Sequence, residues 1–295
     1  MRYGNAEAFR AALEQRLRNQ SSASDASLIR LRKHVSFERL LARLAVVAPD
    51  RWVLKGAYAL ELRLGSGTRA TKDVDLSWRA EEGEVTSRLI EAAATELDDF
   101  FSLRAERTSR LDGPVMLTTV RYAVTCELAG RQFDVFPLDV TLSPMAELRP
   151  THLRLPGSLG FAGIEGPELL LLALEQQLAE KVHAYSGRYG IRQEESSRTK
   201  DLIDMVLISG LAEIDAAVLH EALQTTFAFR ATQAVPAILP PPPRSWAVAY
   251  ARIARDVGLF PDLSAGHAEA ATFLEPILTG AIAKGRWTPI SRRWE

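Results

Sequence analysis

The sequence has a single cysteine, almost no net charge and no long apolar run. One cysteine, Cys126, among 295 residues excludes an internal disulfide and a structural zinc site built from cysteines. The formal net charge is −1, so nothing global directs the chain to nucleic acid or a membrane, and any basic surface has to be local. No apolar run is long enough to cross a bilayer, and residues 1–10 lack the apolar stretch of a signal peptide. We therefore expect a cytoplasmic protein that contacts no membrane.

The composition that is present is typical of a globular protein, with 47% hydrophobic and 25% charged residues. A chain of this length can bury a full core, in one large domain or in two of ordinary size. The pattern of the sequence favours two domains. We expect a mixed α/β domain with N-terminal helices over residues 1–155 and a helical domain over residues 156–295, which gives an α/β (α+β) fold.

Apolar residues recur at helical spacing through residues 28–47, and Pro49 ends this helix because proline cannot continue the hydrogen-bond ladder. Two strand-like runs, 115–128 and 131–142, meet at Ala129 and Gly130, which predicts a tight hairpin. The other elements expected in the front half are helices at 5–20, 56–64 and 84–100 and strands at 52–54 and 73–78. In the rear half we expect helices at 167–186, 199–208, 213–226, 245–256 and 265–282, with an extended linker at 240–243.

Asp73 and Asp75 are the first candidates for chemistry. Residues two apart on a strand share a face, and two such carboxylates can hold one or two Mg²⁺ ions, which relieve their repulsion. A D-x-D pair alone is a weak signal, usually a solvated surface. Here it follows a strand, a glycine (Gly56), a short helix and a glycine-rich turn. A glycine at the start of a helix lets the backbone approach a triphosphate.

A third carboxylate is needed from a neighbouring strand, and the run 133–140 offers Asp134 and Asp139. An odd number of positions separates them, so they face opposite sides of a regular strand and only one can join the site. Pro137 could introduce a bulge that changes this parity. We favour Asp139, and we expect Asp134 to be a solvent-facing edge residue.

The rear half adds Lys181 on one helix and two aspartates on the next. A lysine on such a helix is usually a surface residue, but beside a metal–nucleotide site it would bind phosphate. Asp201 is explained by its place near a helix N-terminus, whereas Asp204 lies deeper among apolar residues. His183 is more typical of a core residue than of a metal ligand.

Four motifs, taken in order, resemble the AbiEii/AbiGii toxin family. They are K-G-x-x-A-L-E-L-R at 55–63, R-x-(T/S)-K-D-x-D at 69–75, E-K-x-H-A at 180–184 and R-x-K-D-L-x-D at 198–204. The ordered set spans roughly residues 30–207 and is far more specific than any one motif. These proteins are the toxins of type IV toxin–antitoxin pairs and belong to the DNA polymerase β-like nucleotidyltransferase superfamily. The resemblance thus implies a polymerase-β-like core with a mixed sheet, followed by a helical C-terminal domain that completes the active site.

The resemblance also implies roles for individual residues. It implies metal binding by Asp73, Asp75 and Asp139, nucleotide binding by Lys55, Gly56, Arg69 and Lys181, and catalytic roles for Asp73, Asp75, Lys181 and Asp204. In one departure, the family commonly has Gly-Gly or Gly-Ser where this chain has Gly56 and Ala57. Triphosphate binding would then depend on backbone N–H groups and cations.

The implied reaction is transfer of a nucleoside monophosphate from an NTP, with Mg²⁺ as cofactor and release of pyrophosphate. Relatives are thought to extend the 3′ end of tRNA and so block aminoacylation and translation. The same core in other enzymes modifies a partner protein (AMPylation) or a small molecule such as an antibiotic, and the latter would have an acidic pocket. A non-enzymatic binding module is the third alternative, and the presence of every expected carboxylate argues against it.

A tRNA acceptor stem needs a basic groove. Two groups of basic residues could provide it, and ordinary solvated surface is the alternative for both. The groups are Arg30, Arg32, Lys33, Arg39 and Arg43 in the helix at 28–47, and Arg286, Arg292 and Arg293 near the C-terminus.

Thr71, two residues before Asp73, is a candidate for regulatory phosphorylation, because the family carries Ser or Thr there. A phosphate would add a charge of about −1.5 to −2 beside the metal carboxylates and compete with substrate phosphates. The resemblance implies a cognate antitoxin, encoded alongside, that silences the toxin in this way.

Overall fold

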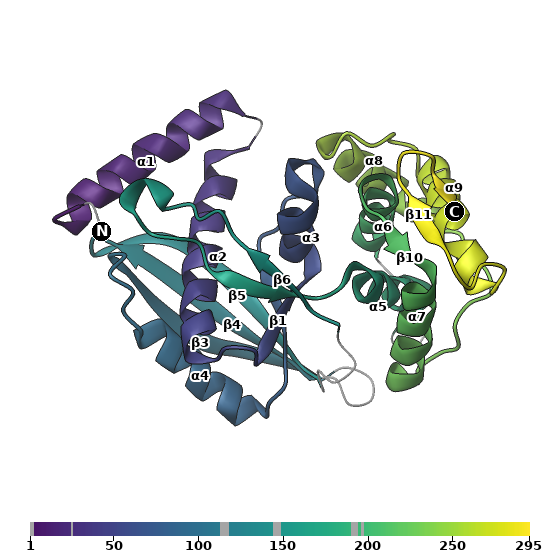
Figure 1. Ribbon diagram of the computed structural model, residues 1–295, viewed down its shortest axis with the longest axis horizontal. Helices are drawn as coiled ribbons and strands as arrows, with labels where there is room; N and C mark the ends of the chain where they lie inside the picture. Colours follow the sequence, from purple (N-terminus) through teal and green to yellow (C-terminus); the bar gives the residue numbers. More distant parts are fainter. Residues whose placement is uncertain (1–2, 25, 113–117, 144–148, 190–193, 196–197) are drawn as a thin grey trace.

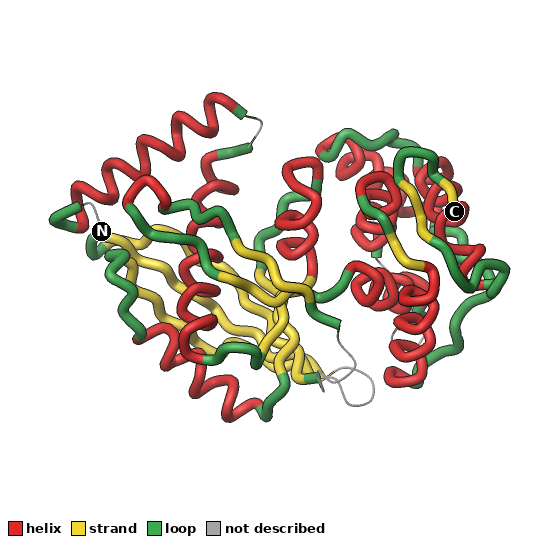
Figure 2. The backbone as a smooth tube through the Cα atoms, in the orientation of Figure 1, coloured by secondary structure: helices red, strands yellow, loops and turns green. Residues whose placement is uncertain are grey.

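A seven-stranded mixed sheet occupies the first part of the chain, and a group of helices occupies the second (Figures 1 and 2). The computed structural model describes residues 3–24, 26–112, 118–143, 149–189, 194–195 and 198–295. The strand order is β3-β4-β5-β2-β1-β7-β6. The strands are β1 (Trp52–Lys55), β2 (Val74–Trp78), β3 (Phe101–Asp112), β4 (Thr118–Leu128), β5 (Arg131–Leu142), β6 (Thr151–Arg154) and β7 (Glu168–Leu171). The expected mixed sheet is therefore present.

Two parallel pairings sit among antiparallel ones. Strand β2 runs parallel to β5, and β1 runs parallel to β7, whereas β3, β4 and β5 form an antiparallel meander. The turn between β4 and β5 has positive φ at Ala129 (52°) and Gly130 (66°), as a two-residue hairpin turn requires. The predicted hairpin is confirmed, although residues 115–117 of the first run lie outside the described residues.

Four helices belong to the sheet half: α1 (Ala6–Ala23), α2 (Leu28–Val47), α3 (Gly56–Leu64) and α4 (Glu82–Ala94). Helix α2 is capped at its N-terminus by Ser27, whose hydroxyl accepts a hydrogen bond from the N–H of Arg30. Its apolar side packs on one face of the sheet, where Phe37 and Leu41 join the core that contains Leu76. Because strand side chains alternate, the neighbours of Leu76 in β2 point to the opposite face. The charged residues described below lie on that opposite face of the sheet.

The second half is mainly helical. Its helices are α5 (Leu174–Ser186), α6 (Thr199–Leu211), α7 (Ala216–Arg230), α8 (Ala247–Asp256) and α9 (Leu263–Leu278). They enclose a core of their own, which includes Leu202, Phe273 and Trp287. The expectation that the rear half is entirely helical was wrong. Strands β10 (Ile214–Asp215), β11 (Arg286–Thr288) and β12 (Arg293–Trp294) form a small sheet, and β8 (Arg188–Tyr189) pairs with β9 (Glu194–Glu195). No helix in the described part of the chain is long and apolar enough to span a membrane.

The expected helix at 167–186 was wrong over its first two turns. Residues 168–171 form β7, which pairs with both β1 and β6, and the helix begins only at Leu174. The predicted helix at 84–100 is also shorter, since α4 ends at Ala94 and β3 begins at Phe101. Strands β6 and β7 lie on either side of residue 155, the expected domain boundary, and both belong to the seven-stranded sheet. The division into two domains at that residue stays a prediction.

Candidate active site

Four neighbouring strands bring four charged side chains into one row. In the strand registers Lys55 of β1 lies opposite Asp75 of β2, Asp75 lies beside Asp139 of β5, and Asp139 lies opposite Arg121 of β4. All four line a cleft of about 510 Å³ on the face of the sheet away from α2. Across the sheet the charges run positive, negative, negative, positive.

The structure separates the two aspartates of β5. Asp139 lies beside Asp75, whereas Asp134 lies toward the other end of β5 and pairs with Lys33 of α2 at 3.1 Å. Only one of the two joins the row, as the parity argument predicted, and it is the favoured Asp139; the register of β4 with β5 runs unbroken through Pro137. Asp134 is no solvent-facing residue, since its side chain is 17% exposed and ion-paired.

The carboxylates in the row repel one another. The pKa of Asp75 is raised to about 7, chiefly by burial and then by the negative charges of Asp73 and Asp139, while Lys55 and Lys181 act in the opposite direction. Asp73 directly precedes β2, and its Oδ1 accepts a hydrogen bond of 2.5 Å from the Thr71 hydroxyl. A divalent cation would relieve the repulsion between these groups. Within the described residues, however, no three acidic, histidine or cysteine side chains converge as a ready-made metal site.

The opposite wall of the cleft comes from the helical half. Lys181 of α5 donates to Asp204 of α6 at 2.5 Å and to Asp201 at 3.3 Å. Arg69, which precedes β2, donates to both oxygens of Asp204 at 2.8 and 3.0 Å. These charges hold the pKa of Asp204 below its usual range despite burial, which acts in the opposite direction. Asp204 is 1% exposed and lies behind Arg69 and Lys181, which line the cleft.

A second ion-pair group on this wall was not foreseen from the sequence. Glu180 accepts from Lys55 at 3.4 Å and pairs with Arg230 of α7 at 3.7 Å. Arg230 also donates to Nδ1 of His183 at 3.3 Å, so His183 is a supporting residue, as expected, and is 5% exposed. Glu180 belongs to the E-K-x-H-A motif and could have been chosen from it, whereas no pattern in the sequence marks Arg230.

The basic groove expected along α2 was wrong. Arg39 and Arg43 are each 1% exposed and pair with Asp99, and Arg43 does so through two contacts of 2.8 Å. The remaining three also have acidic partners, in the pairs Arg30–Glu61, Arg32–Glu14 and Lys33–Asp134. This helix therefore presents little unpaired positive charge.

The C-terminal basic group also lies away from the cleft. Arg286, on β11, pairs with Glu213, and Arg292 pairs with Glu269. Strand β11 is on the side of the helical half that faces away from the sheet (Figure 1). The cations that line the cleft are instead Lys55, Arg69, Arg121, Lys181, Arg198 and Arg230.

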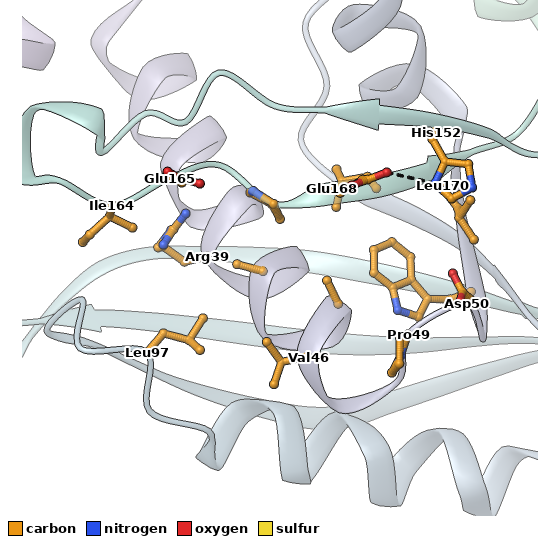
Figure 3. A pocket seen from close by; sticks show the side chains of 15 residues that line it. Arg39, Val46, Pro49, Asp50, Leu97, His152, Ile164, Glu165, Glu168 and Leu170 are labelled. Atoms are coloured by element: carbon orange, nitrogen blue, oxygen red, sulfur yellow. Dashed lines mark ion pairs between the residues drawn. The ribbon is translucent and has the colours of Figure 1, made fainter.

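A second cavity, of about 440 Å³, lies on the α2 face of the sheet, against Val46, Pro49 and Trp52 (Figure 3). Its polar residues include His152, which pairs with Glu168 at 3.2 Å at the cavity edge. The guanidinium of Arg39 is held by Glu38 and Asp99. This cavity lacks the carboxylate row and is not the candidate active site.

Comparisons with known proteins agree with this geometry. A family model described as nucleotidyl transferase AbiEii toxin, type IV TA system, matches residues 39–275. The chain is similar in structure to MenT4, nucleotidyltransferase toxin Rv2826c from Mycobacterium tuberculosis, with 21% identity, a TM-score of 0.55 and coverage of 92% of this chain and 89% of that one. Two Helicobacter pylori structures are more distant. JHP933 has 14% identity and a TM-score of 0.43, with coverage of 85% of this chain and 92% of that one. A putative nucleotidyltransferase has 15% identity and a TM-score of 0.44, with coverage of 87% of this chain and 97% of that one. A search of curated proteins gives no match.

The family match covers well over half of the chain, and it includes the strands and helices that line the cleft. The chain belongs to the AbiEii family of nucleotidyltransferase toxins of type IV toxin–antitoxin systems.

Proposed function

We propose that this toxin acts in the cytoplasm and transfers a nucleoside monophosphate from an NTP to the 3′ end of tRNA, with Mg²⁺ as cofactor. The observation that carries the proposal is the row Lys55–Asp75–Asp139–Arg121, which faces Lys181 across the cleft. Extension of the 3′ end would block aminoacylation and therefore translation.

The acidic part of the row fits a divalent cation. Asp73, Asp75 and Asp139 would hold Mg²⁺, since carboxylate oxygens are the ligands that it prefers and the negative charges of Asp73 and Asp139 both act on the buried Asp75. When bound, the ion would polarise the α-phosphate and favour loss of the proton from the attacking hydroxyl. The protein's own part is to hold Asp75 and Asp139 on two adjacent strands and Asp73 directly before the first of them.

The basic residues fit a triphosphate. Lys181 and Arg69 would bind its oxygens and stabilise the charge that develops on leaving pyrophosphate. Asp204 orients both groups and so acts as a positioning residue. Lys55 and the backbone at Gly56 approach from the sheet side, and the N–H groups at the start of α3 favour an anion there.

The charges of the cleft support a nucleic-acid acceptor over a cationic drug. Among the described residues, six basic side chains line it, against four acidic ones, which are Asp75, Asp139, Glu180 and Asp201. An aminoglycoside-like substrate would need an acidic pocket, whereas three of these four carboxylates are already ion-paired with lysine or arginine, and cations are the groups that a phosphate backbone requires. AMPylation of a partner protein stays as the alternative acceptor class.

Regulation through Thr71 fits the same site. The hydroxyl of Thr71 already contacts Asp73, so a phosphate on it would place negative charge against a metal ligand. The cognate antitoxin is the partner expected to bring about this modification. Thr71 is 6% exposed, so modification would require a local opening of the loop before β2.

The test is transfer from each α-labelled NTP, with Mg²⁺, onto purified total tRNA. Label on tRNA that is lost in Asp73→Ala and Asp139→Ala, but kept in Asp134→Ala, would support the proposal. Asp134 is the matched control, because it lies on the same strand outside the cleft. Label on protein or on a small molecule would contradict tRNA as the acceptor, although the nucleotidyltransferase activity itself would be supported.

A further inference from the structure

Asp139 is fully engaged by a neighbouring arginine. Nε of Arg121 donates to Oδ1 of Asp139 at 2.7 Å, and Nη2 donates to Oδ2 at 2.6 Å. This two-point contact takes the oxygens that a metal ion would use. The contact follows from the fold, because the two residues are directly opposite in the register of β4 with β5.

Arg121 can nevertheless be displaced from its ion pair with Asp139. Its side chain is 43% exposed and lines the cleft, whereas Asp139 is 14% exposed. An ion pair with one solvated partner is only modestly stable, so a competing cation can replace it. The planar guanidinium matches phosphate oxygens as well as carboxylate oxygens, so a displaced Arg121 has a second partner in the same cleft.

We infer that Arg121 competes with the divalent cation for Asp139 and, once displaced, binds a phosphate of the nucleotide. The inference rests on the proposed function, since it takes Asp139 as a metal ligand. The exchange would couple the two binding events: the metal releases the arginine, and the arginine then adds a cation to the triphosphate site. Arg121 thereby becomes a nucleotide-binding residue contributed by the sheet, opposite Arg69 and Lys181.

The test measures Mn²⁺ affinity by titration calorimetry, first without nucleotide and then with a non-hydrolysable NTP analogue. For Arg121→Gln we expect Mn²⁺ alone to bind about tenfold more tightly, the low end for loss of a charge-assisted, partly exposed pair. We expect the analogue, at saturating Mn²⁺, to bind about tenfold more weakly, because a phosphate contact is lost. A purely structural role for Arg121 would not give opposite signs.

The matched control is Arg107→Gln. Arg107 lies on the next strand, β3, is 45% exposed and donates to Glu82 at 2.6 Å, so it makes a similar ion pair outside the cleft. Its replacement should leave both affinities unchanged. Arg121→Lys provides a second variant with the charge kept and the two-point contact removed, and it should fall between wild type and Arg121→Gln.

Asp139→Asn separates the two ideas. If it weakens Mn²⁺ binding while Arg121→Gln changes nothing, the competition is refuted and the metal assignment stands. If Asp139→Asn binds Mn²⁺ as tightly as the wild type does, or if no variant binds Mn²⁺, the assignment of Asp139 as a metal ligand fails. The competition between Arg121 and the metal then fails with it. If the gain in Arg121→Gln disappears in the double variant with Asp139→Asn, the competition at Asp139 is supported.

Discussion

A Cβ atom placed on Gly56 would lie 2.1 Å from Oδ2 of Asp75, a separation that no pair of non-bonded atoms tolerates. The backbone at Gly56 also has a φ of 71°, which L residues adopt only with strain. The glycine at the start of α3 is therefore required by the carboxylate that packs over it, in addition to any contact with phosphate.

Gly56→Ala should abolish transfer. Backbone strain of roughly 1–3 kcal/mol would add to displacement of Asp75, and misplacement of a catalytic group by about 1 Å can cost around 100-fold in rate. Transfer rates and thermal unfolding should be measured beside Gly67→Ala. Gly67 has ordinary φ and open space at its Cβ, so the control should retain activity. Wild-type activity in Gly56→Ala would contradict the close packing.

Asp204→Ala should destabilise the protein as well as inactivate it. The change leaves the buried Lys181 and the partly buried Arg69 without their shared partner, and breaking such a network costs about 3–5 kcal/mol. Chemical denaturation would measure this. Asp201→Ala removes the longer contact of Lys181 and a 3.8 Å pair with the exposed Arg198, and it should cost much less. Equal stability of the two variants would show that Asp204 does not hold the cations together.

Thr71→Glu should abolish transfer, because it places a carboxylate where the hydroxyl now donates to Asp73. Thr71→Val keeps the shape of the side chain and removes only the hydrogen bond, so it should cost at most about tenfold. Labelled-nucleotide transfer measures both variants. An active Thr71→Glu protein would refute silencing by phosphorylation at this residue.

His183 should make folding stability depend on pH. Burial, followed by the charge of Arg230, lowers its pKa to about 4, whereas the unfolded chain has about 6.5. The unfolded state thus binds the proton more tightly, and this contribution to stability is lost as pH falls from about 6.5 to about 4. The loss is at most about 3.5 kcal/mol, at about 1.4 kcal/mol per pKa unit. Unfolding free energies of His183→Gln should fall less steeply over this window. Parallel curves would show that His183 does not titrate there.

The sequence predicted the sheet-side carboxylates well because strand geometry is local. Parity limited the run to one of Asp134 and Asp139, and the two-residue spacing of the D-x-D pair brought Asp73 and Asp75 to attention. Arg121 could not be found this way, since its place depends on the register between β4 and β5. The same limit explains the mistaken groove: the partner of Arg43 is Asp99, and only the packing of α2 shows that this pair is buried.

Strand β7 was missed for a different reason. Its sequence is a short, continuous apolar run rich in leucine, which helix and buried strand share, and periodicity cannot distinguish them. Pairing with β1 decides in favour of the strand. Short strands such as β10, β11 and β12 carry too few residues for any pattern to show.

The bidentate contact between Arg69 and Asp204 joins residues 135 positions apart in the chain. During synthesis the N-terminal part of a protein folds first, as the ribosome lengthens the chain. The sheet, with its carboxylate row, can thus form while α6 has yet to be translated. A nascent chain would hold the carboxylate row but lack Lys181 and Asp204, so the cleft would be complete only after Asp204 has been added and α6 has docked.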